Sequence, residues 1–598
     1  MADDEKKILP IDYTHREFSG IRDDLLEMAE RFYPDTFQDF SEASFGAMMI
    51  DAVAYVGDQL SLYLDYNVNE SFLDTSYQLN NIVRHGRVLG YKNPGRPSTY
   101  GTVSLYVQIP ASTTGMGPDL AYLPVLKRGS TFTSANGLAF VLLENVSFAD
   151  PANQTIVSQQ DPSTGAPTFY AVKAYGKVVS GRFGQEEITV GAYERFKNVK
   201  LSDPNVSEIL SVFDAEGHQY FEVDYLAQDM VFKEIVNNNF KNDNVPSVMK
   251  PMLVSRKFVV ERTRYNTFLQ FGSGKASESN VVARPNQVAM DLYGKSYITD
   301  TTFDPTRLSK NKNFGICPAN TVLTVTYRAT NPMNSNVSVA ALNVVKTSLM
   351  NFVERTKLSN SKVQAVIDSL EVSNETPIIG DVTNPSGEEI KRRIFDTFPT
   401  QNRAVTQADY ENIAYRMPTK FGSVKRCSVY KDQDSLKRNL NMYVISEDSY
   451  GKLIKTNATI KNNLKSWIEQ YRMINDTVDI LDPYIINLGI DFVIKPVPGA
   501  HHNDVLRDAI SALTEAYKDG MFIGEAISIS QAYATLNKVE GILDVVKIKF
   551  NNKVGGNYSS VSFSINKNLS PEGDRLVAPQ NAIFEIKYPS VDIKGKVR

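Results

Sequence analysis

Between residues 17 and 90, apolar side chains recur every three or four positions, the spacing that brings them to one face of an α-helix. Four of them define a first helix: Ile21, Leu25, Ala29 and Phe32. Pro34 ends this helix, because proline has no backbone N–H and its ring clashes with the preceding turn. A longer helix is predicted from Glu42 to Phe72, with Ser41 as its candidate N-cap. The pattern indicates a helical region over residues 1–98.

The longer predicted helix carries a seam of mostly apolar residues. Its members are spaced four and three positions apart in alternation, as in a coiled coil: Phe45, Met49, Ala52, Val56, Gln59, Tyr63 and Tyr66. A second stripe beside it contains Met48, Tyr55 and Leu62. Either the helix packs in the core of its own domain, or it joins a bundle shared with other chains. The width of the apolar surface favours the shared bundle, and the seam residues other than Gln59 are the candidate interface.

From Tyr100 onward the hydrophobic pattern changes to period two, which is typical of β-strands. The stretch "GTVSLYVQIP" alternates in this way, and "SEILSVFDAEGHQYFEVDYL" contains two strands around an Asp-Ala-Glu-Gly turn. Turn residues recur from there to about Arg328. Residues 99–330 are therefore predicted to form one or more β-rich domains.

A helical or mixed connector is predicted over residues 331–422. Its first part, "SVAALNVVKTSLMNFVERT", is expected to be a helix or a mixed connection. Two helix starts with a capping-box pattern follow: Ser386 with Glu389, and Thr406 with Asp409.

The last third of the chain alternates between strands and helices. The first set has strands near 424–430, 440–445 and 477–481, and a helix near 457–473. The second has strands at 485–494 and 542–550, and helices at 503–517 and 529–537. This order predicts two tandem small α+β sandwiches, 423–483 and 484–598, each with helices on one face of a mixed or antiparallel sheet. The polar tail from Phe584 is expected to be exposed or docked on a neighbour. The fold class is thus a multi-domain α+β protein.

Composition narrows the function classes. A chain of 598 residues is too long for one core, and Lys plus Arg total 64 against 68 for Asp plus Glu, without a basic run. This balance argues against nucleic-acid binding. The start "MADDEKKILP" is charged where a signal peptide is apolar, and no apolar run approaches the ~20 residues of a membrane helix. Cys317 and Cys427 lie far apart, which suits a reducing compartment. We expect a soluble protein that folds in a cytoplasm.

The stretch from Gly272 to Lys275, "GSGK", resembles the end of a phosphate-binding loop, but its surroundings do not fit one. Such a loop needs a glycine five positions before the Gly-Lys pair and Ser or Thr after the lysine. Leu269 and Ala276 occupy these two positions. A glycine-rich turn at the end of a strand is the better interpretation.

Other catalytic patterns are also missing from the sequence. The histidines are too scattered for a metal cluster: His15, His85, His218, His501 and His502. Neither cysteine belongs to a Cys-x-x-Cys pair, and no Gly-x-Ser-x-Gly or His-Glu-x-x-His motif occurs. Asp432 and Asp434 fit a solvated loop better than an acid/base pair. We therefore predict no catalytic, cofactor or metal site and no enzymatic activity.

Several segments carry a family resemblance. The block from Asn384 to Ala414, "NPSGEEIKRRIFDTFPTQNRAVTQADYENIA", resembles the signature of the baseplate J-like family of contractile-tailed phages. The matching residues are Asn384, Pro385, Gly387, Glu388, Arg403, Val405, Thr406, Asp409 and Tyr410. Family members also carry a Phe-Gly-x-Gly turn and a Pro-Ala…Tyr-Arg strand, matched by Phe271, Gly272, Gly274, Pro318, Ala319, Tyr327 and Arg328. The glycines are expected to permit a positive-φ turn.

Two further segments, Asn69–Ser98 and Tyr558–Gly595, resemble the N-terminal helical region and the C-terminal end of the wedge protein of T-even-type phages. One departure follows Arg328, where "ATNPMNSN" replaces a Gly-rich turn. Asn, Pro and Ser form turns by other means.

The resemblance implies a structural component of the baseplate wedge in the virion, assembled in the host cytoplasm. It implies an N-terminal bundle with a second copy and a larger wedge partner, and a contact with a sheath-initiator-like protein. Contacts between neighbouring wedges would close an inner ring around the hub, which widens and passes on the trigger for sheath contraction. No cofactor, nucleic acid or membrane is implied.

Two alternatives stay open at this point. One is a β-rich host-binding tail fibre or adhesin, although no repeat of 20–50 residues is visible. The other is a cell-wall hydrolase carried by the tail.

Overall fold

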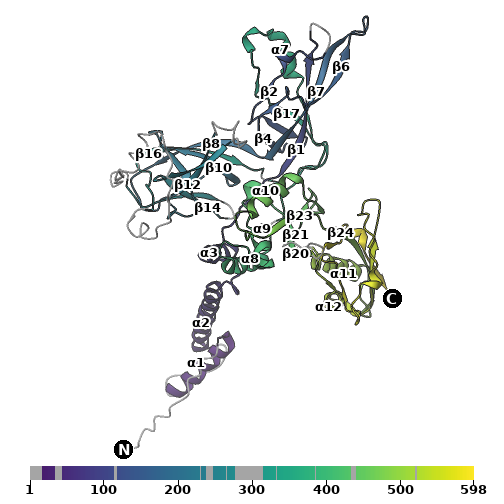
Figure 1. Cartoon of the computed structure of the whole chain (residues 1–598). Coiled ribbons are helices and arrows are strands. Elements are labelled where there is room, and N and C mark those ends of the chain that lie inside the picture. The colour runs from purple at the N-terminus through teal and green to yellow at the C-terminus, as the bar shows by residue number, and fades with distance from the viewer. Residues whose placement is uncertain are drawn as a thin grey trace, which may run out of the picture. The chain divides into compact units, whose positions relative to one another are not determined.

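The computed structural model of the chain is shown in Figure 1. It describes residues 16–33, 44–112, 117–228, 230–236, 247–263, 266–275, 314–331, 333–383, 385–432, 439–518 and 521–598. Two compact units are present, Met1–Lys92 with Pro385–Phe398, and Asn93–Asn384 with Pro399–Arg598. Helices at the N-terminus are followed by β-rich and mixed parts, which confirms the predicted fold class. The four boundaries proposed between the five predicted domains stay predictions.

The first unit is helical. It contains α1 (Phe18–Phe32), α2 (Phe45–Glu70), α3 (Leu79–Val88) and most of α8 (Gly387–Thr400). α1 runs antiparallel to α2, because Arg22 pairs with Asp51 at 2.7 Å and Arg16 pairs with Asp65 at 2.8 Å. Helix α2 begins later than predicted: Ser44, whose side chain accepts the N–H of Ala47, is extended and caps it. The predicted cap Ser41 lies outside the described residues.

The second unit opens with a seven-stranded sheet in the order β17-β3-β4-β7-β1-β19, with β6 paired to β7. Its strands are β1 (Tyr100–Pro110), β3 (Thr131–Ser134), β4 (Ala139–Leu142), β6 (Gln154–Gln160), β7 (Pro167–Ser180), β17 (Leu342–Thr347) and β19 (Glu371–Ser373). A smaller sheet joins β18 (Met350–Asn351), β2 (Val125–Leu126) and β5 (Val146–Ser147). Helix α7 (Asn360–Asp368) buries Val363 and Val366 in the same core.

The segment "SVAALNVVKTSLMNFVERT" does not contain the helix expected as one possibility. It forms β17 and β18, and β17 pairs antiparallel with β3 through two register shifts. These shifts interrupt the period-two pattern that would identify a strand in the sequence.

A second seven-stranded sheet, order β8-β16-β10-β11-β14-β15-β9, lies between β7 and β17 along the chain. Its strands are β8 (Arg182–Val190), β9 (Asn198–Lys200), β10 (Val206–Phe213), β11 (Gln219–Glu222), β14 (Lys257–Arg262), β15 (Thr267–Phe271) and β16 (Thr321–Ala329). β12 (Met230–Val236) and β13 (Ser247–Leu253) pair separately. Since β7 and β17 share the first sheet, the second sheet is an insertion into it, and we call it the inserted sheet. The predicted hairpin around Asp-Ala-Glu-Gly is confirmed by β10 and β11.

Two α+β parts follow. The first has β20 (Arg426–Lys431), β21 (Asn439–Glu447), β22 (Leu453–Lys455) and β23 (Thr477–Leu481), with α9 (Gln407–Tyr415) and α10 (Ala458–Ile468). The second has β24 (Tyr484–Pro496), β26 (Ile542–Lys553), β28 (Ala582–Glu585) and β29 (Ile593–Val597), with α11 (His502–Ala516), α12 (Ile529–Asn537) and α13 (Pro589–Asp592). A short pair joins β25 (Ile527–Ser528) and β27 (Arg575–Leu576). Both main sheets are mixed, as predicted. Ile445, Ile523 and Ile583 form a small core shared by both parts.

The expectation for the C-terminal tail was wrong. β28 and β29 both pair parallel with β24, and Ile583, Phe584 and Ile593 are buried. In β29 the exposed residues Lys594 and Lys596 alternate with less exposed ones. These lysines make the tail polar on average, so the sequence does not identify it as a strand of the core sheet.

Candidate functional site

Helix α2 exposes apolar side chains around most of its circumference. Of its 26 residues only Ala47, Ala54 and Glu70 are buried. All six candidate interface residues are exposed in this single chain: Phe45, Met49, Ala52, Val56, Tyr63 and Tyr66. Their exposed fractions range from 40% at Tyr66 to 74% at Phe45 among the large side chains. An exposed apolar surface of this extent is uncommon on soluble monomers and is typical of interaction sites.

The remaining sides of α2 are also apolar. The second stripe, Met48, Tyr55 and Leu62, is between 56 and 62% exposed. Helix α1 covers only one side, where Ile21 lies against Gly57. A helix that is apolar on most of its circumference is normally buried. In this single chain α1 covers one side of α2, and its other apolar sides stay exposed. No helix in the described part of the chain is long and apolar enough to cross a membrane.

The turn from α2 to α3 is fixed by the carboxylate of Glu70. It accepts hydrogen bonds from the side chain of Asn81 (2.8 Å) and from the backbone N–H groups of Tyr77 (2.9 Å) and Gln78 (3.1 Å). These bonds, led by that of Asn81, lower the pKa of Glu70. The ring Nε2 of His85 lies 2.8 Å from the carbonyl oxygen of Glu70. Glu70 was not predicted from the sequence as a residue that fixes this turn. The sequence feature that could have identified it is a carboxylate placed shortly before a helix start.

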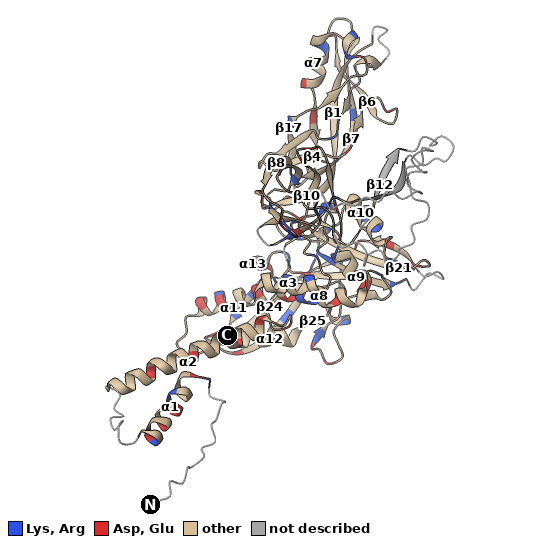
Figure 2. Ribbon diagram, turned by 90° about the vertical axis from the view of Figure 1, so that its left-hand side faces the viewer, with Lys and Arg blue, Asp and Glu red and all other residues tan. Residues whose placement is uncertain are grey.

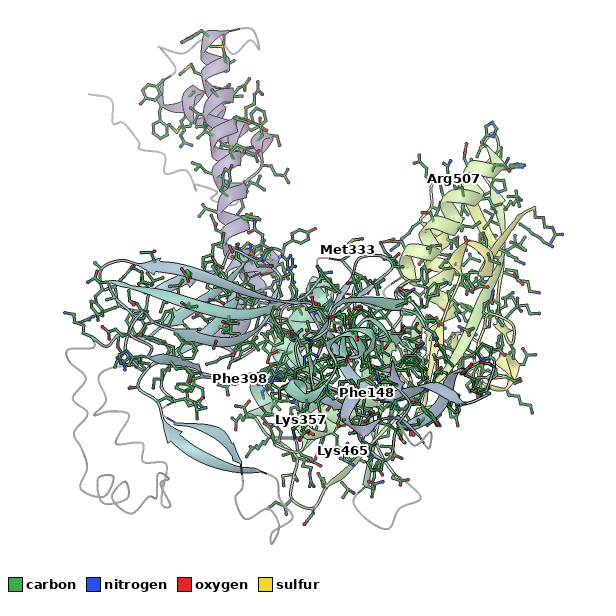
Figure 3. All side chains as sticks on the ribbon, turned by 90° about the horizontal axis from the view of Figure 1, so that it is seen from above. Phe148, Met333, Lys357, Phe398, Lys465 and Arg507 are labelled. Atoms are coloured by element: carbon green, nitrogen blue, oxygen red, sulfur yellow. The ribbon has the colours of Figure 1, made fainter. Side chains whose placement is uncertain are left out.

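Helices α3 and α8 share a small core of Ile82, Tyr91 and Ile394. The family residue Gly387 begins α8, and a Cβ there would lie 3.6 Å from Ile82, an ordinary contact. Asn384 lies outside the described residues, and Pro385 directly follows it. The predicted cap is confirmed, because Ser386 Oγ accepts the N–H of Glu389 at 3.3 Å. The same helix exposes Phe395 and Phe398, the latter labelled in Figure 3.

The Asp-Tyr block forms the start of α9. Asp409 N–H donates to Thr406 Oγ1 (3.2 Å) and Thr406 N–H donates to Asp409 Oδ2 (2.8 Å), which confirms the predicted capping box. Tyr410 is buried and donates to Asp476 at 2.8 Å; burial raises its pKa. The backbone N–H of Arg403 donates to Thr400, while its side chain is exposed. These contacts are structural.

The Phe-Gly-x-Gly turn packs closely against the backbone of Gly315. Phe271 is buried, and its ring meets that of Tyr220 edge-on at 5.4 Å. A Cβ on Gly272 would lie 2.2 Å from the oxygen of Gly315, so glycine is required by close approach. Gly272 itself is not left-handed, against expectation; the positive φ, +97°, is at Gly315. Gly274 N–H donates to Gly315 at 2.9 Å.

Arg328 is buried where the inserted sheet joins the first sheet. Its Nη1 donates to Ser180 O (2.8 Å) and to Ser98 Oγ (3.1 Å), and its Nη2 pairs with Glu208 at 3.4 Å. Only 1% of Arg328 is exposed, and all its contacts cross between segments far apart in sequence.

The segment "ATNPMNSN" continues this polar junction. Asn336 is buried and donates to the carbonyl oxygens of Asp381 (2.7 Å) and Glu447 (3.0 Å). Asp381 in turn accepts the N–H of Ser335 at 3.0 Å. Met333, labelled in Figure 3, stays exposed. Buried amides thus stand where the resemblance led us to expect a Gly-rich turn, and they connect the first sheet to the α+β part.

Three titratable side chains cluster at one turn of the inserted sheet. Asp214, Glu216 and His218 meet at the β10–β11 turn, where His218 Nδ1 lies 3.1 Å from Asp214 and 3.4 Å from Glu216. Asp214 also accepts two backbone N–H groups of its own turn, so the cluster is accounted for by local bonding.

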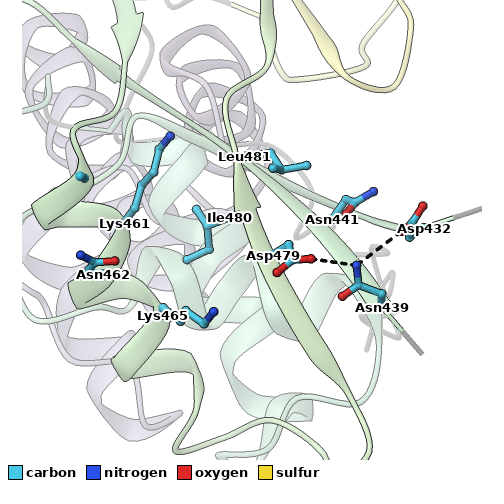
Figure 4. Close-up of a pocket in the computed structure, with 10 residues that line it drawn as sticks. Asp432, Asn439, Asn441, Lys461, Asn462, Lys465, Asp479, Ile480 and Leu481 are labelled. Carbon is cyan, nitrogen blue, oxygen red and sulfur yellow. Dashed lines mark hydrogen bonds between the residues drawn. The ribbon is translucent and has the colours of Figure 1, made fainter. Parts of the chain in front are cut away.

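An open hollow of about 400 Å³ lies beside α10 and β23 (Figure 4). Asn439 links Asp479 and Asp432 at its edge, while Lys461 pairs with Asp482. Asp434 lies outside the described residues, so the suggested Asp432–Asp434 pair is not described as a whole. The lining combines polar residues with apolar ones such as Ile480 and Leu481, and the two charged groups Asp479 and Lys461 have the partners just named.

The N-terminal helices have known relatives. Residues 17–88 match the family model of the bacteriophage baseplate protein, N-terminal domain. No curated protein matches the chain. The match to the family model covers α1, α2 and α3, the segment that carries the exposed apolar helix. It supports a structural protein of a phage-like baseplate.

Two solved structures are similar at low identity. One belongs to the cryo-EM structure of the anti-feeding prophage baseplate (11% identity, 95% of this chain and 89% of that chain, TM-score 0.26). The other belongs to the TssK-TssF-TssG baseplate subcomplex of a type VI secretion system (8% identity, 72% and 95%, TM-score 0.25).

Proposed function

We propose that this chain is a structural component of the baseplate wedge of a contractile phage tail. It forms an inner ring around the hub and transmits the trigger for sheath contraction, and it has no catalytic role. The observation that carries the proposal is the coincidence of two facts about one segment. Residues 17–88 match a baseplate N-terminal domain, and α2 within them exposes apolar side chains on all the sides that α1 does not cover.

The partners follow from the shape of that surface. Helix α2 is ~39 Å long at 1.5 Å per residue, and one neighbouring helix such as α1 covers only part of its circumference. A bundle with a second copy and with a larger wedge protein would cover the remaining sides. A sheath-initiator-like protein and the neighbouring wedges complete the set of partners. The particle is the virion, assembled in the host cytoplasm.

A full-length variant tests the interface. Met49→Glu with Val56→Glu places two carboxylates in the seam, where association would bury them without partners. We expect light scattering across a dilution series at ~0.5 M salt, where contacts between exposed charges are screened, to show a dimer or larger assembly for the wild-type chain and a monomer for the variant. A matched control places the same charges on exposed apolar positions of the second unit, Leu120→Glu with Val353→Glu, and keeps the assembly.

Two outcomes would count against the proposal. If the seam variant assembles like the wild type, α2 is not the interface. If the wild type is monomeric both alone and with the other purified wedge proteins of its phage, the exposed helix has another role.

A further inference from the structure

The main sheet of the second α+β part has one covered and one open face. Helices α11 and α12 cover the first face, where Ile490, Phe492 and Ile494 of β24 are buried. The alternate positions of β24 and of its neighbours β26 and β29 point the other way. On that open face β26 and β29 carry four exposed lysines: Lys547, Lys549, Lys594 and Lys596.

The strand register fixes how these lysines are arranged. Lys549 and Lys594 both pair with Asp491, and Lys547 and Lys596 both pair with Val493 of the central strand β24. Adjacent strands lie ~4.8 Å apart, so the two lysine columns are ~10 Å apart, and the rows are ~7 Å apart along the strands. None of the four lysines forms an ion pair with a residue that the structure describes. Asp491, between them, accepts a hydrogen bond from Asn551.

A complementary surface occurs on α1. Asp23, Glu27 and Glu30 follow one another at helical spacings of four and three, and all three are exposed. They lie opposite the Ile21 face that meets α2, and within the described residues none of them forms an ion pair. The row is ~10 Å long at 1.5 Å per residue. Figure 2 shows the acidic positions of α1 in red.

We propose that the lysine face of one copy binds the α1 carboxylates of a second copy. A helix is ~10 Å wide, so it fits along β24 between the two lysine columns, with its acidic row within reach of both. A protein is favoured over nucleic acid as the occupant, because the chain as a whole has no excess of basic residues, with Lys plus Arg at 64 against 68 for Asp plus Glu. The contact joins two different surfaces, so it can repeat from copy to copy, and it builds a ring when the rotation between successive copies closes. It is a second interface, chemically distinct from the apolar seam.

The test uses full-length protein that carries Met49→Glu and Val56→Glu, so that seam association is removed. Into this background we place either Lys547→Glu with Lys549→Glu, or Asp23→Lys with Glu27→Lys. Sedimentation velocity then measures self-association at low ionic strength and at ~0.5 M salt. A matched control, Lys538→Glu with Lys567→Glu, changes two exposed lysines away from the face.

The background protein and the control should associate at low ionic strength and dissociate in high salt. Each charge-reversed variant alone should show a Kd raised about tenfold or more, in line with several exposed charge pairs lost. An equimolar mixture of the two variants should regain association, because the reversed charges again attract. Circular dichroism confirms that each variant is folded.

Three results would overturn the proposal: association unaffected by lysine reversal, association affected by lysine reversal but not by reversal on α1, or no recovery in the mixture. If the background protein still forms the wild-type assembly, the seam interface fails instead. In that case the charge-reversed variants and their mixture are compared with the assembly of the background protein. A failure of the α2 seam and a failure of the lysine–α1 contact therefore give different results.

Discussion

The Nη1 atom of Arg328 lies 2.8 Å from the carbonyl oxygen of Ser180, and this contact joins the strand that leaves the inserted sheet to the strand that leads into it. Because Ser180 ends β7 and Arg328 lies near the end of β16, one guanidinium holds both ends of the insertion. Its planar fork also reaches Ser98 and Glu208, which a single ammonium group cannot do.

Arg328→Lys is therefore expected to lower the free energy of unfolding by about 2 kcal/mol, because at least one buried acceptor loses its donor. Chemical denaturation followed by circular dichroism measures the change. Arg195→Lys, at an exposed arginine of the same inserted region, should stay within about 0.5 kcal/mol of wild type. Equal stability of the two variants would show that the fork is not needed at the junction.

Thr406→Ala removes one half of the capping box of α9. The N–H of Asp409 then loses its acceptor, and we expect a loss of about 1 kcal/mol without loss of assembly. Thermal melting is the measurement. Thr535→Ala, at a half-buried threonine of α12 whose hydroxyl donates to the backbone oxygen of Gln531 in its own helix, is the matched control with a smaller effect. An unchanged melting temperature for Thr406→Ala would remove this threonine from the cap.

Gly86→Ala tests the close approach of α3 and α8. A Cβ at Gly86 would lie 2.7 Å from Cδ1 of Ile394, so Ile394 must move. Overpacking costs about 1–3 kcal/mol, and alanine regains about 1 kcal/mol of helix propensity. We expect a net loss of about 1 kcal/mol in thermal denaturation.

Ile394→Val removes Cδ1 of Ile394, the atom nearest to the added Cβ, and is the control for this pair. The double variant Gly86→Ala, Ile394→Val should lose less stability than the sum of the two single variants. Strict additivity would mean that the two residues do not limit the helix–helix distance.

Asp381→Asn should change stability in a pH-dependent way. Burial raises the pKa of the Asp381 carboxyl above its ordinary value, so the folded chain binds this proton more tightly than the unfolded chain. The contribution of Asp381 to stability is complete below the unfolded pKa of about 3.9 and declines as pH rises through the folded pKa. Asparagine keeps an acceptor for Ser335 and cannot ionise.

Relative to wild type, the variant should therefore gain stability as pH rises from about 4 toward neutrality. Urea denaturation of both proteins at matched pH values measures the difference. A difference that is constant over this range would contradict the raised pKa.

Local patterns predicted the structure best. The spacing of Thr406 and Asp409 was enough for the α9 cap, because both partners lie within one turn. The start of α2 was three residues off, since Ser41 and Ser44 are both good caps and sequence alone does not choose between them. These are differences of local detail within elements that the hydrophobic period identified.

Long-range features escaped prediction. The membership of β17 and β29 in their sheets depends on partners far along the chain, and register shifts or exposed lysines hid their alternation. The need for glycine at Gly272 comes from the backbone of Gly315, which lies 43 positions later. The predicted interface on α2 stays a prediction, although the exposure of its residues agrees with it.

The inserted sheet enters and leaves the first sheet at neighbouring points, at Ser180 and Arg328. A module attached in this way behaves as a cassette. Its loops and strands can change in length or be exchanged during evolution while the host sheet keeps its own pairing, because both attachment points stay fixed. Variation between related particles that must recognise different neighbours would then concentrate in residues 182–329 and leave the surrounding frame unchanged.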